Sequence, residues 1–156
     1  MTEKFAEVAA GLDLESRARA LGLTPYQVVI IASIIEDETA VDADRPKVAR
    51  VVLNRLARGM PLQLDSTVNY VRTQKKARLT LADIAVESPY NTYAHTGLPP
   101  TPIDSPGEKA LDAALSPAAG DWLYFVTIDK QGNSLFTSDY QEFLRAKAKA
   151  QREGVY

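Results

Sequence analysis

A nearly unbroken apolar run that ends in three acidic residues constrains the fold of this chain more than any other feature. Residues 28–35 are Val-Val-Ile-Ile-Ala-Ser-Ile-Ile, and Glu36, Asp37 and Glu38 follow at once. A helix that is apolar almost all round needs neighbours on several sides, so we predict a central helix here. The segment TPYQ at residues 24–27 holds a capping threonine, a proline and a capping-box glutamine, which predict that the helix begins at this proline.

The two glutamates at the end of the run face different sides of the predicted helix. At about 100° per residue, Glu38 shares a face with Ile31, Ile34 and Ile35, whereas Glu36 is turned about 200° away from Glu38. Burial among branched aliphatic side chains raises the pKa of a carboxyl, which a general acid working near neutral pH requires. Glu38 is therefore the sharper catalytic candidate, although a salt-bridged or exposed glutamate at a helix end fits this geometry equally well.

Length and composition exclude several classes of function. The chain has 156 residues, which fits one domain, and its net charge of -2 is not that of a nucleic-acid binder. It has no cysteine and a single histidine, His95, which excludes zinc–thiolate sites and HExxH chemistry. No stretch approaches the roughly 18 apolar residues of a membrane span. We therefore expect a soluble chain whose chemistry rests on carboxylates, hydroxyls and amides, without a metal or another cofactor.

The rest of the chain predicts an α+β fold, with a mainly helical body around the central helix and a small antiparallel sheet or hairpin. Capping residues, prolines and apolar spacing indicate the further helices. These are expected at residues 1–20, 44–58, 79–86 and 105–116, and from Ser138 or Asp139 onward. The β-branched and aromatic residues of 122–128, followed by a turn and residues 134–137, predict the hairpin.

Two segments lack a helical pattern. Residues 60–67 alternate apolar and polar after a turn, which predicts an extended segment that exposes Gln63 and Asp65, with residues 62–65 as a candidate third strand. Residues 88–107 contain too many prolines and glycines for a helix or a central strand. Because this stretch also carries aromatic and amide side chains, we predict an ordered loop that forms a binding wall.

Arg55 occupies an unusual place in the predicted helix of residues 44–58. It falls within the apolar stripe formed by Val48, Val51 and Val52. A permanently charged side chain in that position predicts a carboxylate partner. An arginine that extends from the stripe to water fits the pattern equally well.

Six segments occur in an order that resembles a known family. They are ASIIEDETA, KVARVVLNRL, LQLDSTVNY, YNTYAHTGLPPTPI, SPGEKALDAALSP and WLYFVTID. Together they resemble the YceG-like catalytic domain of the endolytic murein transglycosylase family. On this resemblance, residues 1–156 form a single catalytic domain with a lysozyme-like cleft. It would comprise an N-terminal helical cover at 1–22, the family-matching core at 23–144 and the end of a C-terminal helix at 145–156.

The resemblance implies a bacterial enzyme that cleaves the β-1,4 bond between N-acetylmuramic acid and N-acetylglucosamine and leaves 1,6-anhydro-muramic ends. Its substrate would be the glycan strands of nascent peptidoglycan, and cell-wall synthases and division proteins are the implied protein partners. Family members act at the outer face of the cytoplasmic membrane through an anchor and a LysM-like region, and we expect this chain to be a soluble fragment without either. No contact with nucleic acid is expected.

The resemblance also implies which residues form the site. The family's catalytic residue is the second glutamate of its ExE motif, which falls on Glu38. Its carboxyl would act first as acid and then as base, with the muramic C6 hydroxyl as the nucleophile. Glu36 is predicted to pair with Arg55 and hold two helices in register, with Asn54 as a second supporting residue. The candidate substrate-binding residues are Gln63, Asp65, Ser66, Thr67, Asn91, Thr92 and Tyr93.

Two alternatives use the same residues differently. A hydrolytic muramidase would use Glu38 together with Asp65 as a second carboxylate and would cleave the same polymer with water. A non-catalytic peptidoglycan-binding or scaffolding module would keep the cleft and bind strands without cleaving them. The products separate these possibilities, since a transglycosylase product is lighter by one water than a hydrolysis product.

Overall fold

The central helix begins and ends where the sequence predicts. The computed structural model describes residues 3–156, and α3 spans Pro25–Glu38 with every residue from Val28 to Ile35 buried. The N–H of Gln27 donates to Oγ1 of Thr24 at 3.2 Å, and the N–H of Thr24 donates to Oε1 of Gln27 at 3.0 Å. This reciprocal capping box fixes the start of the helix.

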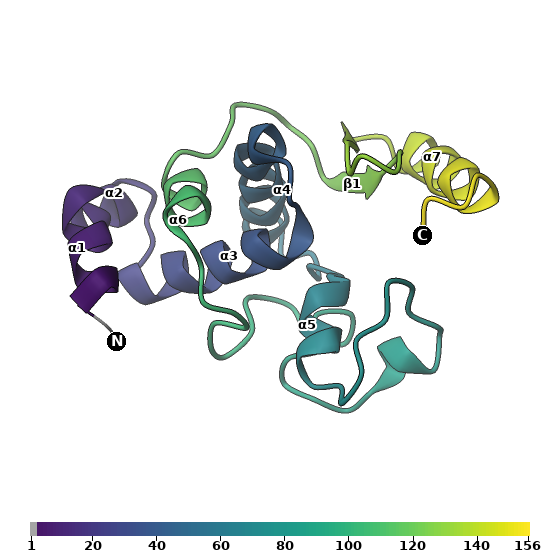
Figure 1. The fold of residues 1–156 in the computed structure, drawn as a ribbon, viewed down its shortest axis with the longest axis horizontal. Coiled ribbons are helices and arrows are strands. Elements are labelled where there is room, and N and C mark those ends of the chain that lie inside the picture. The colour runs from purple at the N-terminus through teal and green to yellow at the C-terminus, as the bar shows by residue number, and fades with distance from the viewer. Residues whose placement is uncertain (1–2) are drawn as a thin grey trace.

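Helices enclose α3 and form the body of the molecule (Figure 1). The elements in chain order are α1 (Glu3–Gly11), α2 (Leu14–Ala20), α3, the 3-10 turn η1 (Asp42–Asp44), α4 (Arg45–Ala57), α5 (Asp65–Tyr70), the 3-10 turn η2 (Asp83–Ala85), α6 (Glu108–Leu115), β1 (Tyr124–Thr127), β2 (Ser134–Thr137) and α7 (Tyr140–Arg152). α3 packs against α2, α4, α5 and α6. The predicted α+β fold with a central buried helix is confirmed.

The N-terminal segment differs from the prediction of one helix over residues 1–20. The chain breaks at Asp13, whose φ of 52° is left-handed, so α1 and α2 are separate helices. Aspartate tolerates this backbone conformation better than most residues. The break lets α2 bury Leu14 and Ala18 in the core beside α3, which a single straight helix with α1 would not allow.

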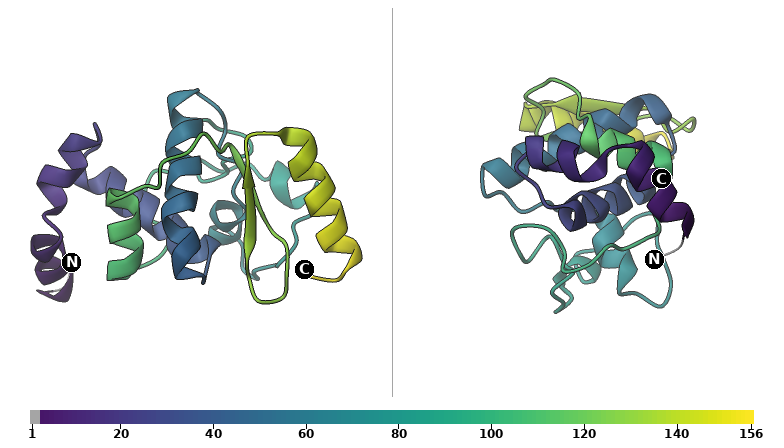
Figure 2. Two further views of the ribbon diagram at one scale, coloured as in Figure 1. Left: turned by 90° about the horizontal axis from the view of Figure 1, so that it is seen from above. Right: turned by 90° about the vertical axis from the view of Figure 1, so that its left-hand side faces the viewer.

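The sheet consists of the predicted hairpin, at the opposite end of the molecule from α1 and α2 (Figure 2). β1 and β2 pair antiparallel, with Tyr124 opposite Thr137 and Thr127 opposite Ser134. α7 packs along this hairpin, and its first turn is capped by the Asp139 carboxylate, which accepts from the N–H of Gln141 at 2.8 Å. The hairpin and the final helix are therefore confirmed.

The candidate third strand at residues 62–65 is wrong. Among the described residues the only sheet has two strands, and the segment before α5 makes a single isolated bridge from Pro61 to Thr96. Gln63 has a left-handed φ of 53°, so the segment is not continuously extended, and the chain enters α5 at Asp65. The alternation of apolar and polar residues predicted an extended segment over residues 60–67, but residues 65–67 belong to the first turn of α5.

The helix predicted at residues 79–86 is only the 3-10 turn η2. Capping contacts do form at this turn: the N–H of Thr80 donates to the Asp83 carboxylate at 2.8 Å, and the N–H of Asp83 donates to Oγ1 of Thr80 at 3.2 Å. Asp83 also accepts from Lys76 at 2.9 Å and from Arg72. The Asp83 carboxylate thus binds two basic side chains of the loop that precedes η2. The 3-10 turn ends at Ala85 and does not continue as a helix.

The proline-rich segment of residues 88–107 is an ordered loop, as predicted. The Asn91 amide nitrogen donates to the carbonyls of Ile84 at 2.9 Å and Val86 at 2.8 Å. Farther along, the N–H of Ile103 donates at 3.0 Å to the buried Ser33 hydroxyl of α3. These bonds fasten the loop to the core and to the neighbouring turn.

Of the helices in residues 3–156, none is long and apolar enough by itself to cross a membrane. Only α2 and α3 together reach that length and composition, across a bend of 90°.

Candidate active site

Glu38 lines a cleft of about 680 Å³. One wall comes from the segment 62–66, at the start of α5, and from Tyr93 of the proline-rich loop. The other wall comes from β1 and α7, the elements farthest from α1 in Figure 1. α3 and α4 contribute Glu38, Val51 and Arg55 to the lining. The central helix therefore ends with its last carboxyl on the lining of this cleft.

Glu38 is the last residue of α3, and its side chain is partly buried. The N–H of Ser66 donates to its Oε1 at 3.3 Å. The pKa of Glu38 is raised to about 7 in total: burial is the largest cause, hydrogen bonding from Ser66 opposes it, and the charges of Asp65 and Asp37 add to the rise. A carboxyl with this pKa is partly protonated at neutral pH and can both give and accept a proton.

Ser66 has bonding capacity left over. Its hydroxyl is buried, lies close enough to Glu38 to lower the pKa of that carboxyl, and makes no hydrogen bond of normal geometry within residues 3–156. Buried hydroxyls in proteins are nearly always hydrogen-bonded, to protein or to water. Since this hydroxyl acts on the pKa of Glu38, we assign it to the support of that carboxyl.

Asp65 and Tyr93 form a hydrogen-bonded pair beside Glu38. The Tyr93 hydroxyl donates to Oδ1 of Asp65, and both side chains line the cleft. Burial, the hydrogen bond to Asp65 and the nearby negative charges together raise the pKa of Tyr93 far above its ordinary value. The phenol therefore stays protonated and remains a hydrogen-bond donor to Asp65.

Arg55 has no carboxylate partner, so that prediction is wrong. It is 7% exposed, and its guanidinium donates to the carbonyls of Leu123 at 2.6 Å, Pro61 at 2.8 Å and Leu62 at 3.0 Å. Leu123 immediately precedes β1, whereas residues 61 and 62 lead toward α5. Carbonyl dipoles thus satisfy the buried cation, which joins the two walls of the cleft.

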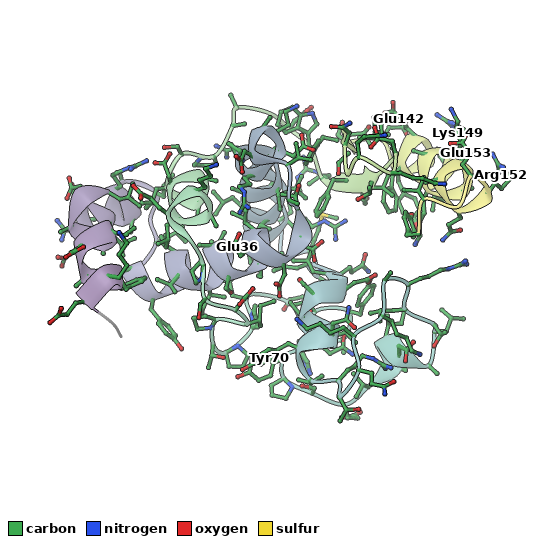
Figure 3. All side chains as sticks on the ribbon, in the orientation of Figure 1. Glu36, Tyr70, Glu142, Lys149, Arg152 and Glu153 are labelled. Carbon is green, nitrogen blue, oxygen red and sulfur yellow. The ribbon has the colours of Figure 1, made fainter. Side chains whose placement is uncertain are left out.

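Glu36 does not pair with Arg55 either. It binds Arg45, the first residue of α4, at 2.6 Å, and its Oε1 accepts from the N–H of Gly107 at 3.0 Å. Glu36 lies in the helical body near α4 and α6 (Figure 3) and does not line the cleft. Glu36 therefore joins α3 to the starts of α4 and α6, which supports a structural role through different partners from those predicted.

Three of the predicted substrate-binding residues lie inside the protein. The Thr67 and Thr92 hydroxyls are 2.8 Å apart, and the hydroxyl of Thr67 also donates to the Leu64 carbonyl at 2.7 Å. Asn91 is fully buried, and none of these three side chains lines the cleft. Since their polar atoms are used internally, we expect them to shape the wall that carries Asp65, Ser66 and Tyr93. Alternating polarity in the sequence did not distinguish these inward side chains from outward ones.

Gln63 and Asn54 complete the predicted set. Gln63 is exposed on the lining of the cleft, and its backbone has a φ of 53°, held by a 3.1 Å bond from its N–H to the Thr92 carbonyl. The left-handed backbone at this position turns the chain from residue 62 into α5. The Asn54 amide donates to the carbonyl of Trp122 at 2.9 Å and does not line the cleft. Asn54 therefore supports the approach to β1 next to Arg55.

The wall formed by β1 and α7 was not predicted as part of the site. It contributes Tyr124, Tyr140, Phe143 and Lys147 to the cleft. The sequence contains a concentration of aromatic residues in the hairpin and the final helix. We interpreted these residues only as contributions to packing. Within residues 3–156, no group of three or more His, Asp or Glu side chains is placed to hold a metal ion.

The sequence model of the YceG-like family matches residues 1–149. The chain belongs to the YceG-like family. A family relative named endolytic murein transglycosylase, from Bacillus subtilis (strain 168), is 43% identical over 124 residues, which are 80% of this chain and 34% of the relative. A protein of the same name from Streptococcus pneumoniae serotype 2 (strain D39 / NCTC 7466) is 33% identical over 132 residues, covering 81% of this chain and 24% of that protein. The predicted family resemblance is confirmed.

A solved structure of a protein described as YceG-like, from Listeria monocytogenes, has the same fold. It matches with a TM-score of 0.79 and 37% sequence identity, over 85% of this chain and 43% of that one. The chain of 156 residues spans about a quarter to a third of the length of the curated relatives it matches. The residues matched by the family model, 1–149, include Glu38.

Proposed function

We propose that this chain is the catalytic part of an endolytic lytic transglycosylase that cleaves peptidoglycan strands between N-acetylmuramic acid and N-acetylglucosamine. The observation that carries the proposal is Glu38: a carboxyl with a pKa of about 7, held by the N–H of Ser66 on the lining of a cleft of about 680 Å³. Two relatives at 43% and 33% identity bear the name endolytic murein transglycosylase, which supports this reaction class.

In the first step, protonated Glu38 gives its proton to the glycosidic oxygen. The bond from the muramic C1 to that oxygen breaks, and the N-acetylglucosamine portion leaves with a free hydroxyl. A raised pKa keeps the proton on the carboxyl until the substrate arrives. Charge then develops on C1 and on the Glu38 carboxylate together.

In the second step, the Glu38 carboxylate accepts a proton from the muramic C6 hydroxyl as that oxygen bonds to C1. The product is a 1,6-anhydro-muramic end, and Glu38 returns to its protonated state. No water enters the products, and the nucleophile belongs to the substrate. One carboxyl therefore suffices, unlike the pair that ordinary glycosidases use.

Gln63 orients the substrate next to Glu38, while Ser66 holds the acid itself. Gln63 presents an exposed amide on the wall of the cleft, and the N–H of Ser66 donates to Glu38 at 3.3 Å. Sugar hydroxyl and acetamido groups carry the donors and acceptors that the Gln63 amide needs. Placing a reacting group within hydrogen-bond reach accounts for a large part of enzymatic rate enhancement.

The bonding of Asp65 weighs against the hydrolytic alternative. A second catalytic carboxylate must accept a proton from water or attack the sugar directly. Asp65 already accepts a hydrogen bond from the Tyr93 hydroxyl, so one of its oxygens is occupied. Asp65 therefore acts as a fixed negative charge that keeps the pKa of Glu38 high.

Mass spectrometry of peptidoglycan digests tests the proposal. Wild-type protein should release muropeptides that are lighter by one water than the products of a hydrolytic muramidase. Glu38→Gln should reduce their release by about 10²–10⁴-fold, the usual contribution of a general acid. Products of hydrolytic mass would establish the muramidase instead, and full activity of the glutamine variant would remove Glu38 from the mechanism.

If the chain does not cleave peptidoglycan, a longer protein is needed as a control. Because the chain spans only part of its relatives, the cleavage assay should be repeated with a full-length relative. Strand binding without cleavage by both forms would establish a peptidoglycan-binding module. In the full-length protein we place the reaction outside the cytoplasmic membrane, where the substrate lies.

A further inference from the structure

Three aromatic side chains form one cluster on the wall of the cleft made by β1 and α7. The ring centroids of Tyr124 and Tyr140 are 5.2 Å apart, those of Tyr124 and Phe143 are 5.4 Å apart, and those of Tyr140 and Phe143 are 6.0 Å apart. All three residues line the cleft that contains Glu38. We call this group the aromatic cluster.

The aromatic cluster is more exposed than packing of α7 on the hairpin requires. Tyr140 is 50% exposed, although it is a large apolar side chain with partners on two sides. Exposed aromatic surface that continues into a cavity is a common feature of ligand sites. Tyr124 and Phe143 are half-buried and account for the contact between α7 and β1.

Cations hold the cluster and border it. The Arg55 guanidinium lies 5.1 Å from the centroid of Tyr124, and the Lys147 ammonium lies 5.9 Å from that of Phe143. Arg55 also binds the Leu123 carbonyl at 2.6 Å, so the position of Tyr124 is fixed from the centre of the protein. Lys147 is exposed and makes no ion pair with any residue that the structure describes.

Four charged side chains of α7 are separated from this face. Glu142, Lys149, Arg152 and Glu153 lie on the side of α7 away from α5 (Figure 3). The helix thus presents the rings and Lys147 toward the cleft. Such a division suits a ligand that lies along the cleft.

We propose that the aromatic cluster is a saccharide platform, on which a sugar of the glycan strand, distant from the cleaved bond, stacks. This inference rests on the proposed function, since the platform and Glu38 share one cleft. A pyranose ring has an apolar C–H face and a rim of hydroxyls. It therefore matches flat rings bordered by the ammonium of Lys147.

Polymer binding at a distance from the reacting bond has a functional consequence. Remote contacts with a substrate strengthen its binding and position the reacting sugar against the acid. A platform across the cleft from Ser66 engages only a strand long enough to reach it. Internal cleavage of long strands is the expected result, with poor use of short fragments.

Tyr140→Ala tests the platform with little risk to the fold. Tyr140 is the first residue of α7 and is half exposed, and the Asp139 cap does not depend on its side chain. Tyr26→Ala is the matched control, since Tyr26 is 51% exposed on α3 and does not line the cleft. Tyr140→Phe keeps the ring and should behave as wild type.

Two measurements on each variant decide the outcome. Binding of a β-1,4-linked N-acetylglucosamine hexamer by the Glu38→Gln protein should weaken about tenfold on adding Tyr140→Ala, as for a central contact residue. In the cleavage assay with long peptidoglycan strands, Tyr140→Ala should raise KM about tenfold and leave kcat nearly unchanged. Tyr26→Ala and Tyr140→Phe should stay within about twofold of their parents in both measurements.

Each other result bears on a different part of the argument. Normal hexamer binding and normal KM in Tyr140→Ala would overturn the platform and leave the transglycosylase proposal standing. Tyr140-dependent binding without cleavage would keep the platform and overturn the proposed function. A hexamer that does not bind the Glu38→Gln protein, together with an unchanged KM in Tyr140→Ala, would also overturn the platform. Loss of thermal stability in Tyr140→Ala, rescued by Tyr140→Phe and without a separate KM effect, would assign the cluster to packing alone.

Discussion

The N–H of Ser66 donates to Oε1 of Glu38 at 3.3 Å and connects the end of α3 to the first turn of α5. This bond holds one carboxyl oxygen. The other, Oε2, accepts no hydrogen bond of normal geometry within residues 3–156 and is left to the cleft. A carboxyl fixed in this way keeps its direction while its proton is transferred. The predictions below follow from this arrangement and from the contacts that support it.

The cleavage rate should depend on the protonation of Glu38. Because burial raises its pKa to about 7, the fraction of protonated acid falls above that pH. We expect kcat to be nearly constant below about pH 7 and to fall about tenfold per pH unit above it. Initial rates of anhydro-muropeptide release in a series of buffers measure this. A rate that rises through pH 7 would mean that the reactive form of Glu38 is the carboxylate.

The same pKa predicts how stability changes with pH. The folded protein holds the Glu38 proton up to about pH 7, whereas the ordinary pKa of the group is 4.5. The folded state therefore binds more protons between these values, and the contribution of Glu38 to the free energy of unfolding falls as pH rises through this window. Glu38→Gln cannot lose a proton, so its stability relative to wild type should be greater at pH 8 than at pH 4.5. Urea unfolding at both pH values measures the difference, and an equal difference at the two would contradict the raised pKa.

Asp65→Asn should move the pH profile and preserve catalysis. The charge of Asp65 contributes to the raised pKa of Glu38, so its removal lowers that pKa and shifts the decline of kcat to lower pH. The asparagine oxygen can still accept from the Tyr93 hydroxyl, which preserves the wall of the cleft. Rates at low pH should therefore remain within about tenfold of wild type. Complete loss of activity at every pH would favour the two-carboxylate muramidase.

Glu36→Gln should affect stability and leave cleavage intact. The substitution removes the charge that binds Arg45 at 2.6 Å, but a glutamine oxygen can still accept from the N–H of Gly107. We expect a loss of about 1 kcal/mol in the free energy of unfolding, since the pair is partly exposed. Thermal melts measure the stability of Glu36→Gln and Glu38→Gln, and the cleavage assay measures the activity of the same two variants. Unchanged stability with lost cleavage would mean that the two glutamates have been assigned the wrong way round.

Arg55→Lys should weaken the connection between the two walls of the cleft. A lysine ammonium cannot reproduce the planar fork that reaches the carbonyls of Leu123, Pro61 and Leu62 together. Carbonyls left without a donor and the lost charged bonds should cost about 2–4 kcal/mol of unfolding free energy. Urea titration measures the loss, with Arg58→Lys as the control because Arg58 is exposed immediately after the same helix. Equal effects of the two substitutions would show that the buried position does not matter.

The sequence was most reliable where the information is local. Thr24 to Gln27 specified the start of α3, and the apolar residues after it specified a buried helix, because capping and burial depend on neighbours within one or two turns. The same reasoning found the hairpin and the cap of α7 at Asp139. Local reasoning failed at Asp13, whose left-handed backbone divides the predicted N-terminal helix into α1 and α2.

The candidate site was predictable only in part. The helical wheel placed Glu38 on the isoleucine face, and the family motif favoured it over Glu36. The partners of Glu36 and Arg55 were predicted wrongly, since Arg45, Gly107 and Leu123 reach them through contacts between separate elements. A buried cation can be satisfied by several backbone carbonyls, and no pattern in the sequence distinguishes these from a carboxylate.

By itself, the sequence determined an α+β chain with a buried central helix, a family and a leading acid, because these follow from periodicity, capping and motif. Only the tertiary structure decided what surrounds that acid. It brought the N–H of Ser66 onto Glu38, turned Thr67 and Thr92 inward, and placed Tyr140 on the lining of the same cleft. Burial, pKa and the shape of a cleft depend on which distant segments meet, and packing of the whole chain sets those meetings.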